Sequence, residues 1–186
     1  MMKVTLTNEI LSYITEIEHN RYKVSSVKLS KPVMNRLRKN SKKKSSYASN
    51  KIEGNPLSEK QVDEVIERDE RKHYLKPEQE VRNYFLALNY LEEKVSKKEK
   101  FSQKLILDVQ KLVEKGASKE KIGLRGSMPP GVLFAVYDSK TGNLDYIPPE
   151  YCDIPELLDE LVEYVNTTDD HPLIAVSYTH LRAHET

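Results

Sequence analysis

Several features that restrict the class of a protein are scarce in this sequence. It has one cysteine, Cys152, no tryptophan, and no wholly apolar run longer than the five residues 132–136. A single cysteine excludes a disulfide framework within the chain and a cysteine-rich zinc site, and it favours a reducing compartment. The short apolar runs exclude a membrane span, and the polar residues 1–9 do not form a signal peptide. We therefore expect a soluble cytoplasmic protein without a membrane partner.

The charges nearly cancel over the whole chain, but they are unevenly distributed. Residues 1–60 hold 13 Lys and Arg against 5 Asp and Glu, whereas residues 141–186 hold 1 against 10. The basic excess peaks at Arg36, Arg38, Lys39, Lys42, Lys43 and Lys44. Such a run can follow a phosphate backbone, but it contains no aromatic side chain that could stack on single-stranded bases. A solvated helix face is the preferred interpretation, and a nucleic-acid surface is the alternative.

The apolar spacing is mostly helical, and the 186 residues are enough to bury a core. Helices are expected to begin near Thr7 or Asn8, Ser30, Ser58, Pro77, Ser102, Asp153 and His171. Two of them are expected to end at Gly54 and at Gly116. The predicted fold class is mainly α, a helical bundle with one β-hairpin.

The hairpin is expected within residues 131–147. Two β-prone runs, 131–137 and 144–147, flank the turn-forming segment 138–143. An isolated hairpin is only marginally stable in water, so this one must either lie on the helices or serve a purpose beyond stability. It is therefore interpreted either as a structural cover or as an edge that accepts an extended peptide.

Three separated segments resemble the Fic family of protein adenylyltransferases, which are built on a helical core. They are SYASNKIEGNPLS at 46–58, GLRG at 123–126 continuing through the hairpin to YIPPEY at 146–151, and DIPELLDELVEYVN at 153–166 followed by HPLI at 171–174. In order, they are similar to the family's inhibitory helix, to its hairpin flap, and to the helices that precede its catalytic signature. The resemblance spans about residues 45–174 and implies an incomplete Fic-like helical bundle.

The resemblance assigns an inhibitory role to Ser49, Glu53 and Gly54. They fill the family pattern of Ser or Thr, three residues, Glu, and then Gly or Asn. Residues four apart share one face of a helix, and glycine is a common helix end. In the family this Glu pairs with an Arg of the signature and interferes with the nucleotide γ-phosphate, which implies nucleotide regulation by Glu53. Without its neighbouring motifs, the pattern is also typical of an ordinary solvated helix end.

The flap residues that the resemblance implies for target binding are Val132, Leu133, Phe134, Ala135, Val136 and Tyr137. The family's flap aligns the target hydroxyl through main-chain hydrogen bonds along a strand edge. Arg125 comes just before the hairpin. We expect its side chain to approach a phosphate or a carboxylate, or to form a surface salt bridge.

The family's catalytic signature is absent from the sequence. It consists of His-Pro-Phe, two variable residues, Gly-Asn-Gly-Arg, two more, and Arg, whereas here no glycine follows Gly142. His171-Pro172 is followed by Leu173-Ile174, so His171 is assigned no catalytic role. No residue is assigned to catalysis or to a metal. We therefore expect a Fic protein that stops before its catalytic motif and is inactive as given.

The expected organisation has three parts. Residues 1–75 form an N-terminal region with the inhibitory helix, residues 76–174 form a partial Fic core with the flap, and residues 175–186 form a chimeric tail. The tail departs from the family near Ala175 and is similar to strings that end many unrelated environmental reading frames. A core that stops short is expected to expose apolar surface near Leu157, Leu161 and Ile174.

The resemblance implies a function for the full-length parent. It would be a protein AMP-transferase that uses ATP and Mg²⁺, modifies a Ser, Thr or Tyr hydroxyl of a target protein, and is autoinhibited by Glu53. No cofactor is expected on the chain as given, a homodimer stays open, and a nucleic-acid partner is disfavoured. The alternatives are an antitoxin-like protein that supplies its Glu to a partner's active site, and a helical DNA-binding regulator that uses residues 36–44.

Overall fold

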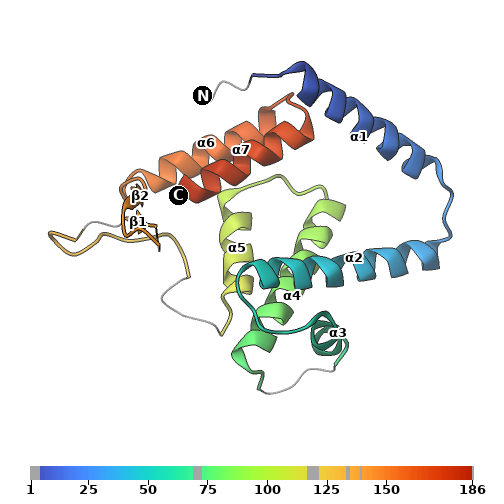
Figure 1. Cartoon of the computed structure of the whole chain (residues 1–186), viewed down its shortest axis with the longest axis horizontal. Coiled ribbons are helices and arrows are strands. Elements are labelled where there is room, and N and C mark those ends of the chain that lie inside the picture. Colours follow the sequence, from blue (N-terminus) through green and yellow to red (C-terminus); the bar gives the residue numbers. More distant parts are fainter. Residues whose placement is uncertain (1–4, 69–72, 117–121, 133–134, 139, 186) are drawn as a thin grey trace. The chain divides into compact units, whose positions relative to one another are not determined.

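The computed structural model describes residues 5–68, 73–116, 122–132, 135–138 and 140–185 (Figure 1). The elements are α1 (Asn8–Ser26), α2 (Lys31–Ile52), α3 (Glu59–Glu67), α4 (Lys76–Ser96), α5 (Gln103–Val113), β1 (Val136–Tyr137), β2 (Leu144–Tyr146), α6 (Ile154–Thr167) and α7 (Pro172–Glu185). The fold is therefore mainly helical with one two-stranded hairpin, which confirms the predicted class. Among the described residues, no helix is long and apolar enough to cross a membrane.

Side-chain caps begin three helices at the residues that the sequence predicts. The Thr7 hydroxyl accepts a hydrogen bond from the Ile10 amide at 3.2 Å, at the start of α1. At α3 the cap is reciprocal, since the Ser58 amide donates to Gln61 Oε1 at 2.9 Å and the Gln61 amide donates to Ser58 Oγ at 3.4 Å. The Ser102 hydroxyl caps α5 in the same way as Thr7 caps α1. These bonds satisfy amides that have no partner within the helix.

The chain divides into two compact units, Met1–Lys42 and Lys43–Thr186, and the division falls within α2. In the first unit, α1 carries no buried residue. Leu11 and Ile17, two apolar residues at helical spacing in α1, are each 46% exposed. The apolar side chains of α1 are therefore not part of a hydrophobic core. The predicted boundary at residue 75 rests on the family resemblance and stays a prediction.

A first core in the second unit lies between α3 and α4. Val62, Val65 and Val81 are buried there. Tyr47 from α2, Leu57 and Ile66 pack against them. Since α3 packs directly on α4, this core fixes the α3–α4 pair and the last turns of α2 next to it.

A second core lies between α5 and α6. Ile154, Leu158 and Leu161 are buried there, with Phe101, Ile106 and Val165 packed against them. Leu161 is only 7% exposed, so the prediction that it would be part of an exposed apolar surface is wrong. The reason is that the apolar side of α5 covers it. Leu157 and Ile174 are partly buried, and Leu173 and Val176 beside Ile174 are exposed, so the prediction of exposed apolar surface is not contradicted there.

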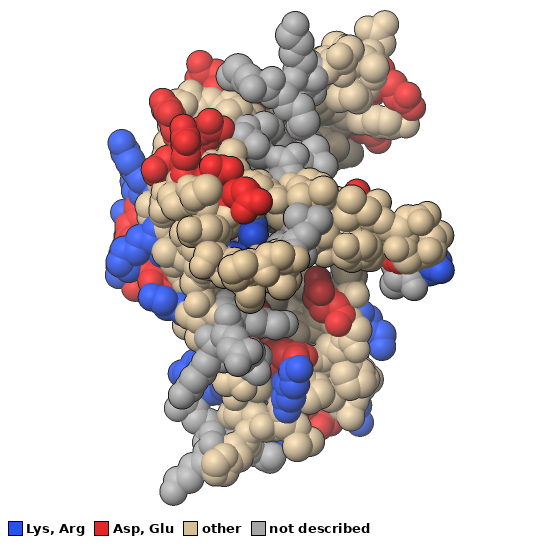
Figure 2. Space-filling view, turned by 90° about the vertical axis from the view of Figure 1, so that its left-hand side faces the viewer, with Lys and Arg blue, Asp and Glu red and all other residues tan. Residues whose placement is uncertain are grey.

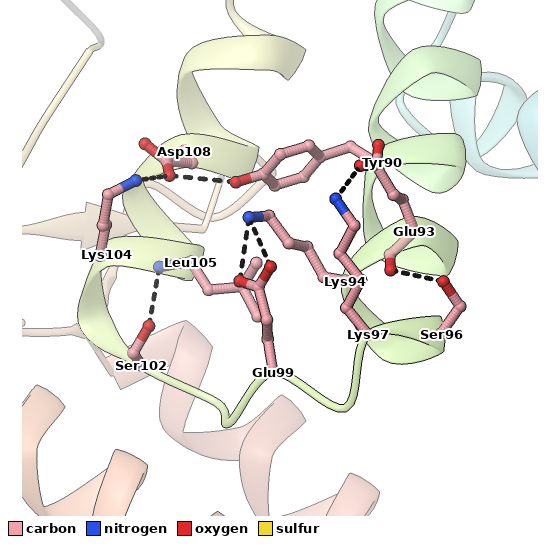
Figure 3. A network of polar contacts seen from close by, with 10 residues as sticks. All are labelled: Tyr90, Glu93, Lys94, Ser96, Lys97, Glu99, Ser102, Lys104, Leu105 and Asp108. Atoms are coloured by element: carbon pink, nitrogen blue, oxygen red, sulfur yellow. Dashed lines mark hydrogen bonds and ion pairs between the residues drawn. The ribbon is translucent and has the colours of Figure 1, made fainter.

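Polar contacts join α4 to α5 (Figure 3). The Tyr90 hydroxyl donates to Asp108 Oδ2 at 3.1 Å, and Lys104 pairs with the same carboxylate. The hydrogen bond from Lys104 lowers the pKa of Asp108. Lys94 bonds Glu99 at 2.9 Å across the connection between the helices, which raises the pKa of Lys94. The charges of this network pair with one another, so the network links two helices rather than offering a ligand site.

The hairpin is shorter than predicted, because β1 and β2 contain only two and three residues. Val136 pairs with Tyr146 and Tyr137 with Leu144, with an irregularity between the pairs. Asp138 organises the turn, since its carboxylate accepts hydrogen bonds from the amides of Lys140 at 2.8 Å and Thr141 at 2.6 Å. The bonds from Thr141 are the main reason why the pKa of Asp138 is lowered.

Candidate functional site

Ser49, Glu53 and Gly54 lie within the last turn of α2 and the residues that follow it. The Gly54 amide donates to the Lys51 carbonyl at 3.1 Å, and the Asn55 amide donates to the Asn50 carbonyl at 2.9 Å. Together with a φ of +83° at Gly54, these bonds form a Schellman helix end. The sequence prediction that α2 stops at Gly54 is therefore confirmed. Glu53 is left as the C-cap residue, just outside the helix.

Glu53 is exposed, and within the described ranges its carboxylate forms no hydrogen bond or ion pair. Its position is electrostatically unfavourable, because carbonyl groups give the C-terminal end of a helix a partial negative charge. A basic residue is favoured there, and α2 has one in Lys51. An acidic residue that breaks this local rule without a compensating contact is a candidate for function.

Ser49 is partly buried and its hydroxyl donates to Tyr84 Oη at 2.8 Å. Tyr84 belongs to α4, so this bond ties the last turns of α2 to α4. A tyrosine 35 residues away from Ser49 carries no sequence signal for this contact. The role of Tyr84 as the partner of Ser49 could therefore not be predicted from the sequence.

Asn55 was also missed as a site residue, although it lies next to the predicted inhibitory pair. It is only 5% exposed. Its Nδ2 donates to the Pro77 carbonyl at 3.0 Å and to Glu80 Oε2 at 2.9 Å, and its Oδ1 accepts from the Leu57 amide at 3.1 Å. The signal that could have drawn attention to it is an asparagine directly after a helix-ending glycine, since this residue type often bonds nearby backbone.

The hairpin is the second candidate region, and its described apolar side chains are accessible. Val132, Val136 and Tyr137 are 49%, 45% and 57% exposed, and Ala135 is partly buried. Leu133 and Phe134, the other two predicted flap residues, lie outside the described residues. The predicted target-binding residues therefore belong to a different element from the predicted inhibitory residues, which lie at the end of α2.

Both arms of the hairpin are fastened by side chains. The Gln110 side chain, from α5, accepts from the Gly123 amide at 2.8 Å and donates to the Gly123 carbonyl at 3.2 Å. Arg125 donates to the Pro149 carbonyl, which joins the incoming arm to the outgoing one. Arg125 thus has a backbone partner, which the sequence analysis did not foresee. These contacts fasten the incoming arm to α5 and to the segment that leads into α6.

The basic run offers fewer free charges than its sequence suggests. Lys43 bonds Glu67 at 2.7 Å and lies 3.4 Å from Asp63, and only 11% of its side chain is exposed. The hydrogen bond to Glu67 raises the pKa of Lys43, so this charge holds α3 against α2. Figure 2 shows another face of the chain, the left-hand side of the view in Figure 1, where both signs of charge are interspersed with uncharged residues. The pairing of Lys43 reduces the charge that the run could offer to a phosphate backbone. The choice between a solvated helix face and a nucleic-acid surface stays a prediction.

His171 and the acidic side chains are the candidates to consider for a metal site. His171 lies at the start of α7, where its Nδ1 accepts from the Leu173 amide at 3.3 Å. Across the part of the chain that the structure describes, no three His, Cys, Asp or Glu side chains lie close enough together to hold a metal ion. The region around Glu53 is therefore a regulatory candidate rather than a catalytic one.

No protein-family model matches the sequence, and no curated protein matches it. Among solved structures, the chain is similar to the crystal structure of a Fic family protein from Desulfovibrio desulfuricans G20, with a TM-score of 0.75 and 23% sequence identity. The chain has a Fic-like fold. The match covers 98% of this chain and 52% of that one, so the chain spans about half the length of its structural neighbour.

Within this Fic-like fold, the three segments that resemble the family lie on the expected kinds of element. The segment 46–58 ends α2 and leads into α3, the second segment contains the hairpin, and the third forms α6 and the start of α7. At 23% identity the likeness shows the fold alone. The roles of Ser49, Glu53, Gly54 and the flap residues therefore remain predictions.

Proposed function

We propose that this chain is the regulatory and target-docking part of a Fic-family protein AMP-transferase, and that Glu53 inhibits this enzyme. The observation that carries the proposal is an exposed carboxylate without a described partner at the end of α2, within a Fic-like fold. The surrounding sequence, SNKIEGN at 49–55, matches the family's inhibitory pattern. A carboxylate placed against the electrostatic preference of its helix is well suited to bind a cation supplied from elsewhere.

The proposed inhibition is electrostatic. A carboxylate forms a short bidentate pair with an Arg guanidinium, and it repels a phosphate that approaches the same place. Glu53 would thus occupy an Arg that otherwise contacts the nucleotide, and its charge would oppose the γ-phosphate. That Arg belongs to the signature, which the sequence of residues 1–186 does not contain.

The hairpin would present the target. An exposed strand edge accepts an extended segment through main-chain hydrogen bonds that require little sequence specificity. The exposed side chains of Val136 and Tyr137 offer apolar contacts beside that edge. The bonds of Gln110 to Gly123, and of Arg125 to the Pro149 carbonyl, would keep the edge in a defined position.

ATP and Mg²⁺ would bind to the longer protein. The described residues do not fit these groups, because no acidic cluster suitable for a metal is present among them. The sequence also lacks the glycine-rich turn that would cradle phosphates. We therefore assign this chain no step of the transfer itself, and we propose a cytoplasmic protein substrate with an accessible hydroxyl group.

The test uses the longest native reading frame that contains residues 1–174, because residues 175–186 are expected to be a chimeric tail. We expect that frame to encode the His-Pro-Phe and Gly-Asn-Gly-Arg signature, and the purified protein to transfer labelled AMP from ATP in the presence of Mg²⁺. A frame without the signature, or a protein with the signature that transfers no AMP even as the Glu53→Gly variant, would contradict the proposal.

A matched control separates the inhibitory role from a general effect of charge. Glu59 is another exposed carboxylate close to Glu53 in sequence, but it lies in the first turn of α3. Glu53→Gly is expected to raise AMP transfer, while Glu59→Gly leaves it at the parental level. Equal activation by both substitutions would exclude a specific role for Glu53.

A further inference from the structure

We propose that Asn55 is the positioning residue that holds the Glu53 turn on α4, and that releasing Asn55 relieves inhibition although Glu53 itself is intact. This inference rests on the proposed function and adds a residue to it. The juxtaposition that carries it is a buried amide side chain two residues from Glu53 that bonds both the backbone and a side chain of α4.

Every polar group of Asn55 that can anchor the turn is in use. Its backbone amide closes the helix end on Asn50 at 2.9 Å. Its side chain donates to Pro77 and Glu80 in α4, and it accepts from Leu57, all at 2.9–3.1 Å. With 5% exposure, the side chain is shielded from water that could replace these bonds. Asn55 thus provides the polar bonds described between this turn and the first part of α4, beside the apolar packing of Leu57 on the core that contains Val81.

A second contact keeps the same end of α2 on the same helix. The bond from Ser49 to Tyr84 joins the last full turn of α2 to α4 at 2.8 Å. Pro77, Glu80 and Tyr84 are spaced three and four residues apart, so they lie along one face of α4. Glu53 comes between Ser49 and Asn55 in sequence, and both of its flanks are therefore tied to one rigid helix. Its carboxylate, by contrast, projects without a described partner.

This arrangement separates a fixed backbone from a charged group that has no partner among the described residues. An inhibitory carboxylate acts well only if its position is defined, because the cost of ordering it is then already met in the free protein. Substituting Asn55 removes the anchor and leaves the carboxylate chemically unchanged. We therefore expect Glu53 to inhibit AMP transfer less strongly in the Asn55 variant, although its charge is unchanged.

Asn83 provides a matched control. It is also a buried asparagine, with 0% exposure, and its Nδ2 also donates two bonds, to the carbonyls of Val113 at 2.8 Å and Lys115 at 2.7 Å. These bonds fasten α4 to the end of α5 and involve no residue of the Glu53 turn. Asn83→Ala therefore imposes a comparable loss of buried hydrogen bonds without touching the proposed positioning contact.

The first measurement is amide hydrogen exchange on this chain under native conditions. Asn55→Ala is expected to speed the exchange of the Glu53 and Gly54 amides at least about tenfold relative to the parent, whereas Asn83→Ala changes them less than about twofold beyond any global effect. Unchanged protection of Glu53 and Gly54 in Asn55→Ala would overturn the inference.

A second variant covers the case in which Asn55→Ala does not fold. Asn55→Asp keeps the shape but places a carboxylate where Nδ2 now donates to Glu80, and the two acidic groups repel each other. Adding Glu80→Gln restores a donor opposite the new carboxylate, while the bond to the Pro77 carbonyl stays lost, so the double variant is expected to recover part of the protection of the Glu53 amide. Failure of Asn55→Asp to loosen the turn, or exchange in the double variant as fast as in Asn55→Asp, would contradict the assignment.

The second measurement is AMP transfer by the native frame that contains this chain. Asn55→Ala is expected to raise transfer at least about threefold and Glu53→Gly at least as much, with Asn83→Ala at or below the parental rate. Activation by Glu53→Gly but not by Asn55→Ala would overturn the positioning role while the proposed function stands. If neither Glu53→Gly nor Asn55→Ala raised AMP transfer, while Asn55→Ala did speed exchange of the Glu53 amide, the proposed function would be overturned. The regulatory role of Asn55 would then be overturned with it.

Discussion

The carboxylate of Glu53 lies at the C-terminal end of α2, where the carbonyl groups of the helix already concentrate negative charge. An acidic residue in such a position lowers the stability of the fold. The position is understandable if the carboxylate serves a purpose outside the folded unit. Stability and the proposed inhibitory function would make opposite demands at this residue, and both can be measured.

Neutralising Glu53 is expected to stabilise the chain. Glu53→Gln removes the repulsion at the helix end and should raise the free energy of unfolding by about 0.3–1 kcal/mol at low salt. Urea denaturation of the parent and variant measures this change. Glu59→Gln serves as the control, because Glu59 lies at the N-terminal end of α3, where a carboxylate is favourable, and its loss should destabilise. Destabilisation by Glu53→Gln would show that the carboxylate has a stabilising contact.

Gly54 is required for its backbone conformation. Its φ is +83°, and no atom lies within 4 Å of the position that a Cβ would take, so Gly54→Ala meets backbone strain and no steric obstruction. The expected loss is about 1–2 kcal/mol of unfolding free energy, again from urea denaturation. Gly126→Ala is the matched control, since that glycine has equal space and no positive φ, and should change stability by less than about 0.5 kcal/mol. Equal losses would refute the conformational explanation.

Residue-level patterns predicted the helix starts and the end of α2, but not the long-range polar anchors. The hydroxyl groups of Thr7, Ser58 and Ser102 each accept from the amide three positions further along the chain, so a local sequence pattern contains all that is needed. Asn55 bonds a carbonyl 22 residues away. The residue type suggests only a turn, because its distant partner depends on how α4 packs.

At the scale of elements, the hairpin depends on its turn. Only two strand pairings join β1 to β2 among the described residues, and Asp138 makes several bonds to the backbone of the connecting segment. The sequence predicted the location of the hairpin from β-prone residues and turn formers. The predicted strands are longer than those in the structure, because the strand propensity of a residue does not determine where main-chain pairing ends.

The turn is expected to loosen in acid. In the folded state the pKa of Asp138 lies below its ordinary value of 3.8, because the ionised carboxylate accepts bonds from Thr141 and Lys140. The stabilisation is therefore complete above about pH 4 and is lost as the pH falls through the lowered folded-state pKa. Amide exchange of Thr141, followed by NMR across this range, should show the loss. Asp138→Asn should abolish the pH dependence in that range, and an Asp138 pKa above 3.8 would contradict the account.

At the scale of the whole molecule, burial is concentrated in the unit Lys43–Thr186. Its two apolar cores are connected through the packing of α4 on α5 and of α5 on α6. The sequence predicted these apolar helix faces, yet it placed Leu161 at an exposed surface. Periodicity identifies an apolar face, but it does not show which neighbouring helix covers that face.

A pair of identical substitutions tests this distribution. Leu158 is 5% exposed in the core between α5 and α6, whereas Leu11 in α1 is 46% exposed. Leu158→Ala should lower the free energy of unfolding by about 2–5 kcal/mol, because it opens a cavity. Leu11→Ala should change it by no more than about 0.5 kcal/mol. Urea denaturation of both variants measures these two changes. A large loss of unfolding free energy for Leu11→Ala would mean that α1 packs against a core.

The central claim is that the Glu53 carboxylate inhibits AMP transfer in a Fic enzyme. It is tested most directly by the ratio of AMP incorporated by Glu53→Gly to that incorporated by the parent, in the native frame that contains this chain, at equal protein and ATP concentrations. A hydrogen-bonded charged pair contributes about 1.5–3 kcal/mol, so its loss predicts a ratio of at least about ten. A ratio near one would contradict the claim.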